Sequence, residues 1–194
     1  MDKRVVLASK SPRRKELLGR LIPEFEIEVD DSEEVMDMSV PPEEAVKRLA
    51  VKKAENVAKK IQKDALIISA DTTVFIDGEI LGKPKDEKNA KEMLRCLSGR
   101  EHYVSTGICV YDTKSGKLVS DFERTAVRFR YISDDEIEGY IKSGEPMDKA
   151  GAYGIQNLGA LFVEGIKGDY FNVVGLPLFK LGRLLKDEFD ISFI

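Results

Sequence analysis

The amino-acid sequence predicts an α/β protein in which a mixed sheet is flanked by helices. Two observations support this class. Short apolar runs with the pattern of buried strands alternate along the chain with longer segments in which apolar residues recur at helical spacing. The 194 residues are 42% hydrophobic and 34% charged, a composition that is typical of a folded domain with its own core. We therefore expect a single domain over residues 1–194.

The first third of the chain predicts a strand, a helix, a short strand and a long helix, at residues 5–8, 13–20, 25–27 and 41–61. Ser11 and Pro12 are the residue types favoured at a helix N-cap and at the first helical position. Phe25 and Ile27 alternate with charged residues, which is typical of an exposed strand. The long helix has apolar residues at helical spacing, so one of its faces should point inward.

The remainder predicts a buried strand, a helix, a hairpin of two long strands and two further helices, at residues 65–70, 86–97, 102–111, 118–131, 133–143 and 178–185. The buried strand should end at Asp71, and residues 74–76 should lead into a turn. Asp86 is suited to capping one helix, and Ser133 with Glu136 forms a capping box for another. Irregular loops are expected at residues 81–84 and 144–159.

The charge and composition exclude several classes of protein. A net charge of −4 and a pI near 5.3 provide no overall field for a nucleic-acid backbone, so no nucleic-acid partner is expected. No apolar run approaches the roughly 20 residues of a membrane span or resembles a signal peptide, so we expect a cytoplasmic protein. The single histidine, His102, excludes a His-rich metal centre and leaves a Ser-His-Asp triad unsupported. The missing Walker pattern argues against a motor ATPase.

The strongest local signal is a cluster of donors and positive charge at residues 9–14, between the first strand and the first helix. Free N–H groups at a helix start make an anion site, and Ser9, Lys10, Arg13 and Arg14 add hydroxyls and charge. The alternative is a solvated helix start whose arginines bridge acidic neighbours. Because cations are unfavourable at the positive end of a helix, we favour a phosphate-binding role.

A second signal comes from carboxylates that could meet these cations. Asp71 follows a buried strand, the place where ligands gather in open α/β sheets, and it can hold a metal ion or take a proton from water. Together with Glu34 it would supply the two carboxylates that suit Mg²⁺. Lys53 and Lys83 complete the candidate set. Each of these residues alone is typical of a solvated surface or a turn, so the hypothesis depends on their meeting.

A third signal is the glycine-rich stretch from Gly144 to Gly159, which is typical of a shaped loop that approaches a ligand closely. Gln156 can both donate and accept hydrogen bonds, which suits recognition of a base edge. Tyr153 could stack on a base or lie in the core with its hydroxyl satisfied.

Together these segments resemble the Maf family of nucleotide pyrophosphatases. The first is Leu-Ala-Ser-x-Ser-Pro-Arg-Arg-x-Glu-Leu-Leu, and the set covers nearly the whole chain, at residues 7–18, 70–72, 81–84, 97–99, 148–156 and 174–177. The resemblance implies an elongated α/β fold related to the inosine triphosphate pyrophosphatases, with two lobes around a central cleft. It also implies hydrolysis of a nucleoside triphosphate between the α and β phosphates, a Mg²⁺ or Mn²⁺ requirement, and a homodimer.

The resemblance also implies roles for individual residues. Asp71 would activate water and share the metal with Glu34, although the acidic stretch leaves the choice between Glu33 and Glu34 open. The resemblance implies phosphate binding by Ser9, Arg13, Arg14, Lys53 and Lys83. The branch of the family that acts on 7-methylguanosine triphosphate tends to carry Trp, Gln and Glu at three positions where this chain has Arg13, Thr72 and Gln156. Those three residues are similar to the branch that cleaves dTTP and UTP.

Two rival functions remain beside the enzymatic one. The family is also linked to septum formation, so a regulatory binding protein that blocks cell division is the main alternative, although no exposed amphipathic stripe indicates a partner surface. Nucleic-acid binding through the basic cluster at residues 10–20 would conflict with the acidic total. For the enzyme, modified pyrimidine nucleotides are the cellular substrates that we favour over normal dTTP and UTP.

Overall fold

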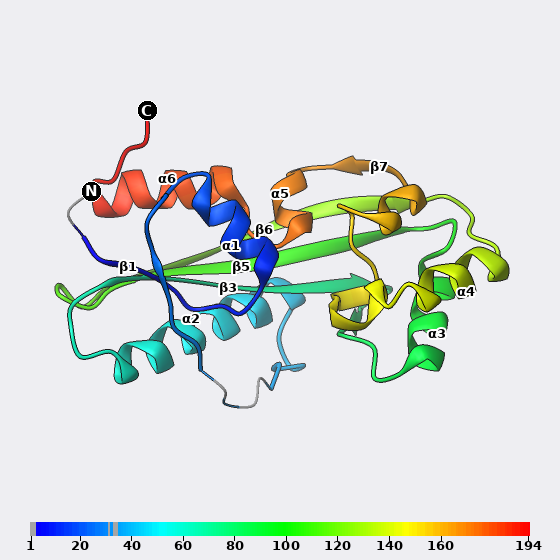
Figure 1. The fold of residues 1–194 in the computed structure, drawn as a ribbon, viewed down its shortest axis with the longest axis horizontal. Helices are drawn as coiled ribbons and strands as arrows, with labels where there is room; N and C mark the ends of the chain where they lie inside the picture. The colour runs from blue at the N-terminus through cyan, green and yellow to red at the C-terminus, as the bar shows by residue number, and fades with distance from the viewer. Residues whose placement is uncertain (1–2, 31, 33–34) are drawn as a thin grey trace. The chain divides into compact units, whose positions relative to one another are not determined.

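A computed structural model describes residues 3–30, 32 and 35–194 (Figure 1). The chain forms two compact units. Unit 1 comprises Met1–Asp71, Thr106–Glu123 and Gly175–Ile194, and unit 2 comprises Thr72–Ser105 and Arg124–Val174. Because three long strands contribute residues to both units, the single domain over residues 1–194 stays a prediction. In the described part of the chain, every helix is too short or too polar to cross a membrane.

The sheet has seven strands in the order β2-β1-β3-β5-β6-β7, with β4 paired to β3. Their bounds are β1 Val5–Leu7, β2 Glu26–Ile27, β3 Leu66–Ile76, β4 Glu79–Leu81, β5 Glu101–Asp112, β6 Lys117–Phe129 and β7 Val163–Lys167. Strand β1 runs parallel to β2 and β3, whereas β4 is antiparallel to β3 and β7 is antiparallel to β6. The predicted α/β class with a mixed sheet and flanking helices is therefore confirmed.

Unit 1 has helices on both faces of its strands, α1 (Pro12–Gly19), α2 (Pro42–Lys60) and α6 (Leu178–Phe189). In Figure 1, α2 lies on one side of the strands and α1 and α6 lie on the other. The predicted apolar stripe of α2 is buried, and Ala50, Ala54 and Val57 pack against Val6 and Ile67 of the sheet. Small residues in this stripe let the helix approach the sheet closely.

Gly107 of β5 sets how close α2 lies to the sheet. A Cβ atom built on Gly107 would lie 2.4 Å from the backbone carbonyl carbon of Val46 in α2. Contacts below 3.0 Å with a backbone cannot be relieved by a side-chain rotation, so this position tolerates only glycine without movement of the helix. The glycine therefore fixes the spacing between β5 and α2.

Unit 2 has its own apolar core. Its helices are α3 (Glu87–Leu97), α4 (Asp134–Lys142) and α5 (Tyr170–Val174), with short 3₁₀ segments η1 (Glu145–Asp148), η2 (Ala150–Ala152) and η3 (Leu158–Phe162). Leu94 of α3, Ile137 of α4 and Phe129 of β6 are fully buried in one cluster. Asp86 caps α3, and the capping box of Ser133 and Glu136 begins α4, as predicted.

Several element boundaries differ from those predicted. Strand β3 does not end at Asp71 but continues to Ile76, because β4 returns through a tight turn at Asp77 and Gly78 and pairs with residues 74–76. Asp71 is therefore an interior residue of the strand. Helix α6 extends beyond Leu185 to Phe189. Strands β4 and β7 and helix α5 were not predicted, because segments of three to five residues have little local signal.

His102 is fully buried, and its Nε2 lies 2.8 Å from the Tyr153 hydroxyl, so both residues belong to the core. Burial lowers the pKa of His102 from 6.5 to about 3. Between these two values the unfolded chain binds a proton on this imidazole and the folded protein does not, so stability falls as pH falls below 6.5.

We predict that this difference is visible in the pH dependence of stability. From pH 7.5 to pH 5 the wild type should lose about 2 kcal/mol more free energy of unfolding than His102→Gln, at about 1.4 kcal/mol per unit of pKa difference. Denaturant unfolding of both proteins at the two pH values measures this. Equal losses of free energy of unfolding in the two proteins would contradict the lowered pKa of His102.

Candidate active site

The candidate site residues of unit 1 lie on neighbouring elements, since residues 9–14 follow β1 and Asp71 lies on β3, which pairs with β1. Strand β1 stops at Leu7, which pairs with Ile68, and the Ala8 amide donates to the Ile68 carbonyl at 2.8 Å. Strand β3 continues beyond this pair towards Asp71. The prediction that Asp71 stands at the end of its strand is therefore wrong, because this carboxylate lies inside β3, whereas Ser9 follows the end of β1.

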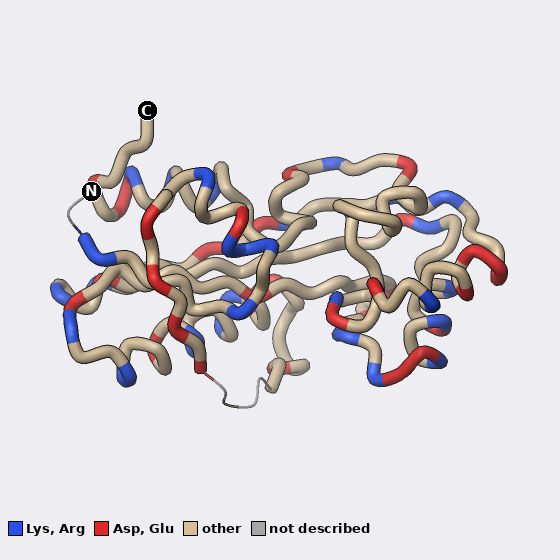
Figure 2. Tube along the Cα trace, in the orientation of Figure 1, with Lys and Arg blue, Asp and Glu red and all other residues tan. Residues whose placement is uncertain are grey.

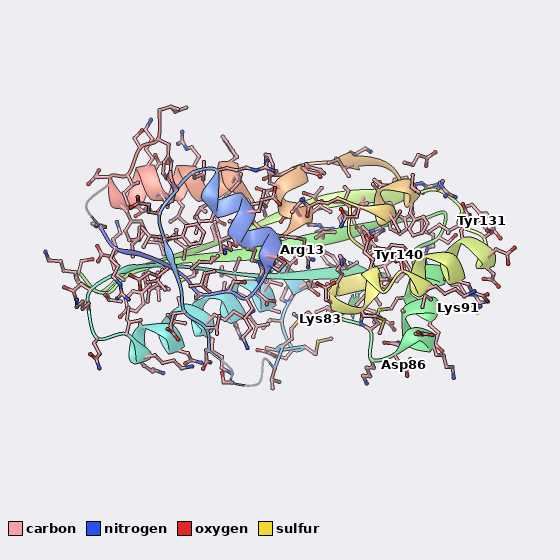
Figure 3. All side chains as sticks on the ribbon, viewed as in Figure 1. Arg13, Lys83, Asp86, Lys91, Tyr131 and Tyr140 are labelled. Carbon is pink, nitrogen blue, oxygen red and sulfur yellow. The ribbon has the colours of Figure 1, made fainter. Side chains whose placement is uncertain are left out.

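The loop between β1 and α1 is organised around two hydroxyls. The buried Ser9 Oγ accepts hydrogen bonds from the Ser11 amide at 3.2 Å and from Arg14 Nη1 at 3.3 Å. Ser11 is the N-cap of α1, as predicted, and its Oγ accepts from the Arg14 amide at 3.4 Å. Figure 2 shows Lys and Arg together at the start of α1, and Figure 3 labels Arg13 there.

Arg14 is held by a residue that the sequence did not indicate as functional. Its Nε donates to the Gly175 carbonyl at 2.8 Å, across 161 positions of sequence. Gly175 has a φ of 122°, a backbone conformation that residues other than glycine rarely adopt. The Val-Gly-Leu-Pro segment at residues 174–177 is one of the segments that resemble the Maf family, but the sequence indicated no role for it. The Gly175 carbonyl orients the Arg14 guanidinium at the loop that we predict to bind phosphate.

Lys53 and Asp71 form a buried ion pair in unit 1. Lys53 Nζ lies 2.6 Å from Asp71 Oδ1, and the side chains are 14% and 10% exposed. Ser69 lies two residues before Asp71, on the same face of β3, and its Oγ donates to the Ala50 carbonyl of α2 at 2.6 Å. Because Ala50 and Lys53 are three residues apart on one face of α2, the two contacts align this helix with the strand.

The predicted metal ligands can be judged only in part. Glu34 and its alternative Glu33 lie outside the described residues. Among the residues that are described, no group of three or more His, Cys, Asp or Glu side chains could hold a metal ion. Asp71 suits a hard cation, because Lys53 bonds to one of its two carboxylate oxygens and Mg²⁺ takes much of its coordination from water and phosphate.

Asp30, the first residue of the acidic stretch at residues 30–34, is bound to α2. Asp30 accepts a hydrogen bond from Asn56 at 2.7 Å and pairs with Lys60 at 3.1 Å. Hydrogen bonds from Ser32 and Asn56 hold the pKa of the Asp30 carboxyl well below its usual range. Asn56 lies three residues after Lys53, so this anchored segment runs along the part of α2 that carries the ion pair.

The other candidates belong to unit 2. Lys83 is exposed in the loop after β4 (Figure 3), and Thr72 and Gln156 are half-buried. The Gly151 amide donates to the Gly82 carbonyl at 3.0 Å, which joins the loop of Lys83 to the glycine-rich stretch. The roles of these three residues beside Asp71 stay predictions. Tyr153 lies in the core with its hydroxyl bonded to His102, which confirms the core interpretation and rules out the alternative that it stacks on a base.

Comparison with known proteins gives the family. A family model described as Maf-like protein matches residues 4–188. The chain belongs to the Maf family. It is 53% identical over 191 residues to the dTTP/UTP pyrophosphatase of Alkaliphilus metalliredigens, covering 98% of this chain and 99% of that protein. It is 49% identical to the dTTP/UTP pyrophosphatase of Clostridium perfringens strain 13, covering 98% of this chain and all of that protein.

Solved structures resemble this Maf protein more distantly. The Ham1 protein of Staphylococcus aureus has a TM-score of 0.46 at 17% identity, over 66% of this chain and 72% of that chain. The HAM1 protein of Coxiella burnetii has a TM-score of 0.46 at 16% identity, over 82% of this chain and 91% of that chain. Values at this level add nothing to the fold described above.

Proposed function

We propose that this Maf protein hydrolyses dTTP and UTP to the monophosphate and diphosphate. The observation that carries the proposal is the identity of about half of all residues, over 98% of the chain, with proteins named dTTP/UTP pyrophosphatase. The buried Lys53–Asp71 pair and the Ser9–Arg14 loop support it chemically, since one offers a carboxylate for water activation and the other offers donors for phosphate.

The proposed reaction is a displacement at the α-phosphorus. The oxygen of a water molecule attacks that phosphorus, the bond to the bridging oxygen breaks, and diphosphate leaves. The proton of the water passes to Asp71, whose carboxylate is oriented by Lys53 at Oδ1. Phosphoryl transfer of this kind depends on positioning and charge stabilisation more than on covalent catalysis, which agrees with a site rich in cations.

Phosphate binding falls to the cationic residues and to the helix start. Ser9, Arg13 and Arg14 lie at the N-terminus of α1, where the positive end of the helix dipole favours anions. Lys53 and Lys83 add ammonium groups. A divalent cation such as Mg²⁺ or Mn²⁺, held by Asp71 and Glu34, would supply neutralisation of the phosphate oxygens.

Three further parts of the proposal concern substrate specificity, localisation and oligomeric state. Arg13, Thr72 and Gln156 select pyrimidine nucleotides of the dTTP and UTP type, and the cellular substrates include modified pyrimidine triphosphates that would otherwise enter nucleic acid. The protein works in the cytoplasm, where these nucleotides are found. It acts as a homodimer.

Release of diphosphate from a panel of triphosphates tests the proposal. The panel contains dTTP, UTP, CTP, GTP, 7-methylguanosine triphosphate and modified pyrimidine triphosphates, each with Mg²⁺, Mn²⁺ or EDTA. Metal-dependent release concentrated on dTTP and UTP is the expected result. Turnover of 7-methylguanosine triphosphate instead would overturn the specificity assigned to Arg13, Thr72 and Gln156. No turnover of any nucleotide would overturn the enzymatic function and favour the septum-blocking alternative.

A further inference from the structure

The turn that carries Gln156 is closed by residues from a different part of unit 2. Gln156 lies in a turn between η2 and η3, with Gly154 before it and Leu158 after it. Ile155, beside Gln156 in the turn, is buried, and the residues on either side of the turn are held by hydrogen bonds. Both ends are bound by one pair of side chains, Glu145 and Tyr140.

Glu145 and Tyr140 hold the turn through hydrogen bonds on each side of Gln156. Glu145 Oε2 accepts from the Leu158 amide at 3.2 Å, and its Oε1 accepts from the Gly159 amide at 3.4 Å. The Tyr140 hydroxyl donates to Glu145 Oε1 at 2.9 Å and accepts from the Gly154 amide at 3.2 Å. The two amides at the start of η3 would otherwise lack partners, because no helical carbonyl precedes them.

The ends of the turn also approach each other closely. A Cβ atom on Gly159 would lie 2.5 Å from the Gly154 carbonyl oxygen and 2.9 Å from the Tyr140 hydroxyl. A Cβ atom on Gly154 would lie 2.7 Å from the Lys149 side chain. Lys149 Nζ donates to the Glu145 carbonyl at 2.6 Å, which fixes that neighbour as well. Each end of the turn is therefore packed against the residues that bind it.

Tyr140 is a rigid anchor for this arrangement. Its ring, on α4 (labelled in Figure 3), is 4% exposed and packs edge-to-face on Phe162 with the ring centroids 5.0 Å apart. Burial, with a further contribution from Glu145, raises the pKa of the Tyr140 hydroxyl well above its usual range. The hydroxyl therefore remains protonated at neutral pH and donates to the carboxylate.

We propose that Glu145, acting with Tyr140, is a positioning residue that holds Gln156 in place for recognition of the pyrimidine edge. The proposal rests on the proposed function. Uracil and thymine present an acceptor at O4, whereas cytosine presents an amino donor at the same position. An amide held in one place can discriminate between these edges, and an amide on a loose turn can shift to satisfy either.

The test is the ratio of kcat/KM for UTP to kcat/KM for CTP. Glu145→Gln keeps the size of the side chain but replaces one acceptor oxygen with an amino group, which cannot accept from an amide of η3. We expect the ratio to fall about tenfold, through a higher KM for UTP with kcat within about twofold of the wild type. Tyr140→Phe keeps the ring and removes the hydroxyl, and it should lower the ratio about threefold.

Two comparisons separate positioning from a general loss of structure. Glu138→Gln changes an exposed carboxylate of α4, the helix that carries Tyr140. Glu138 pairs with Lys91 of α3, so this substitution should leave the ratio unchanged. In a Gln156→Ala background, adding Glu145→Gln should change the ratio by less than about twofold, because a residue that acts through Gln156 has nothing left to position. Independent, additive effects of the two substitutions would overturn the proposal.

The remaining outcomes are also decisive. A lower melting temperature with UTP and CTP turnover reduced equally would assign Glu145 a purely structural role and overturn the proposal. If Glu145→Gln fails to fold, the ratio measured for Tyr140→Phe decides the question alone. If the wild type hydrolyses UTP and the variants have the same UTP-to-CTP ratio as the wild type, only the positioning role is overturned. If the wild type hydrolyses no nucleotide, the proposed function itself is overturned.

Discussion

Replacing Asp71 with Asn should lower kcat for dTTP by about a thousandfold, within the range that a positioned general base contributes. The amide has the size of the carboxylate but cannot take a proton from water, and it is a weaker ligand for a hard cation. Lys53, only 14% exposed, would lose its ion-pair partner, so the variant should also be less stable. Steady-state kinetics with dTTP, and denaturant unfolding in parallel, measure the two effects separately.

Asp77→Asn is the matched control for Asp71→Asn. Asp77 is an exposed carboxylate at the turn after the same strand, and Asn tolerates its positive φ of 54°. Its kcat should stay within about twofold of the wild type. Asp71→Asn with kcat near that of the wild type would show that another group activates the water, even if the nucleotide panel supports the reaction.

Replacing Gly107 with Ala is the second change for which we expect a large effect, and it should lower both the free energy of unfolding and kcat. The added methyl group would meet the backbone of Val46 at 2.4 Å, so α2 must move away from β5 or the strand must distort. Overpacking against a backbone should lower the free energy of unfolding by about 3 kcal/mol. Because α2 also carries Lys53, the same movement would disturb its 2.6 Å contact with Asp71 and lower kcat.

Unfolding in urea and dTTP kinetics on the folded fraction check both parts of this prediction. Gly139→Ala is the control, since Gly139 lies in α4 with no atom within 4 Å of an added Cβ, and Ala is the better helix former. That variant should be as stable as the wild type or slightly more stable. Gly107→Ala with unchanged stability would contradict the close approach of α2 to β5.

Local sequence signals predicted most of the secondary structure correctly. Ser11 before Pro12, Asp86, and Ser133 with Glu136 each begin a helix where expected, because a cap needs only its neighbours within one turn. The main error was the end of the buried strand, which was predicted at Asp71. The continuation of β3 to Ile76 depends on pairing with β4, a partner too short to predict from its own residues.

The candidate site was predicted as a set of residues but not as an arrangement. The loop proposed to bind phosphate could be recognised locally, because helix-start amides, hydroxyls and arginines all lie within residues 9–14. The contact of Arg14 with Gly175 could not, because it joins positions 161 residues apart. Glu145 lies inside the glycine-rich stretch, but no role could be assigned to it, because its hydrogen bonds to the Leu158 and Gly159 amides form only when the turn folds back onto it.

By itself, then, the sequence determined the α/β class, most helix starts, the Maf family and the residue types available for phosphate chemistry. Those properties follow from periodicity, capping and motif order, which are all written along the chain. The tertiary structure decided that Lys53 pairs with Asp71, that Gly175 orients Arg14, and that Glu145 holds the turn of Gln156. These contacts depend on how closely a helix packs on a sheet and on which strands are neighbours, distances that no local pattern encodes.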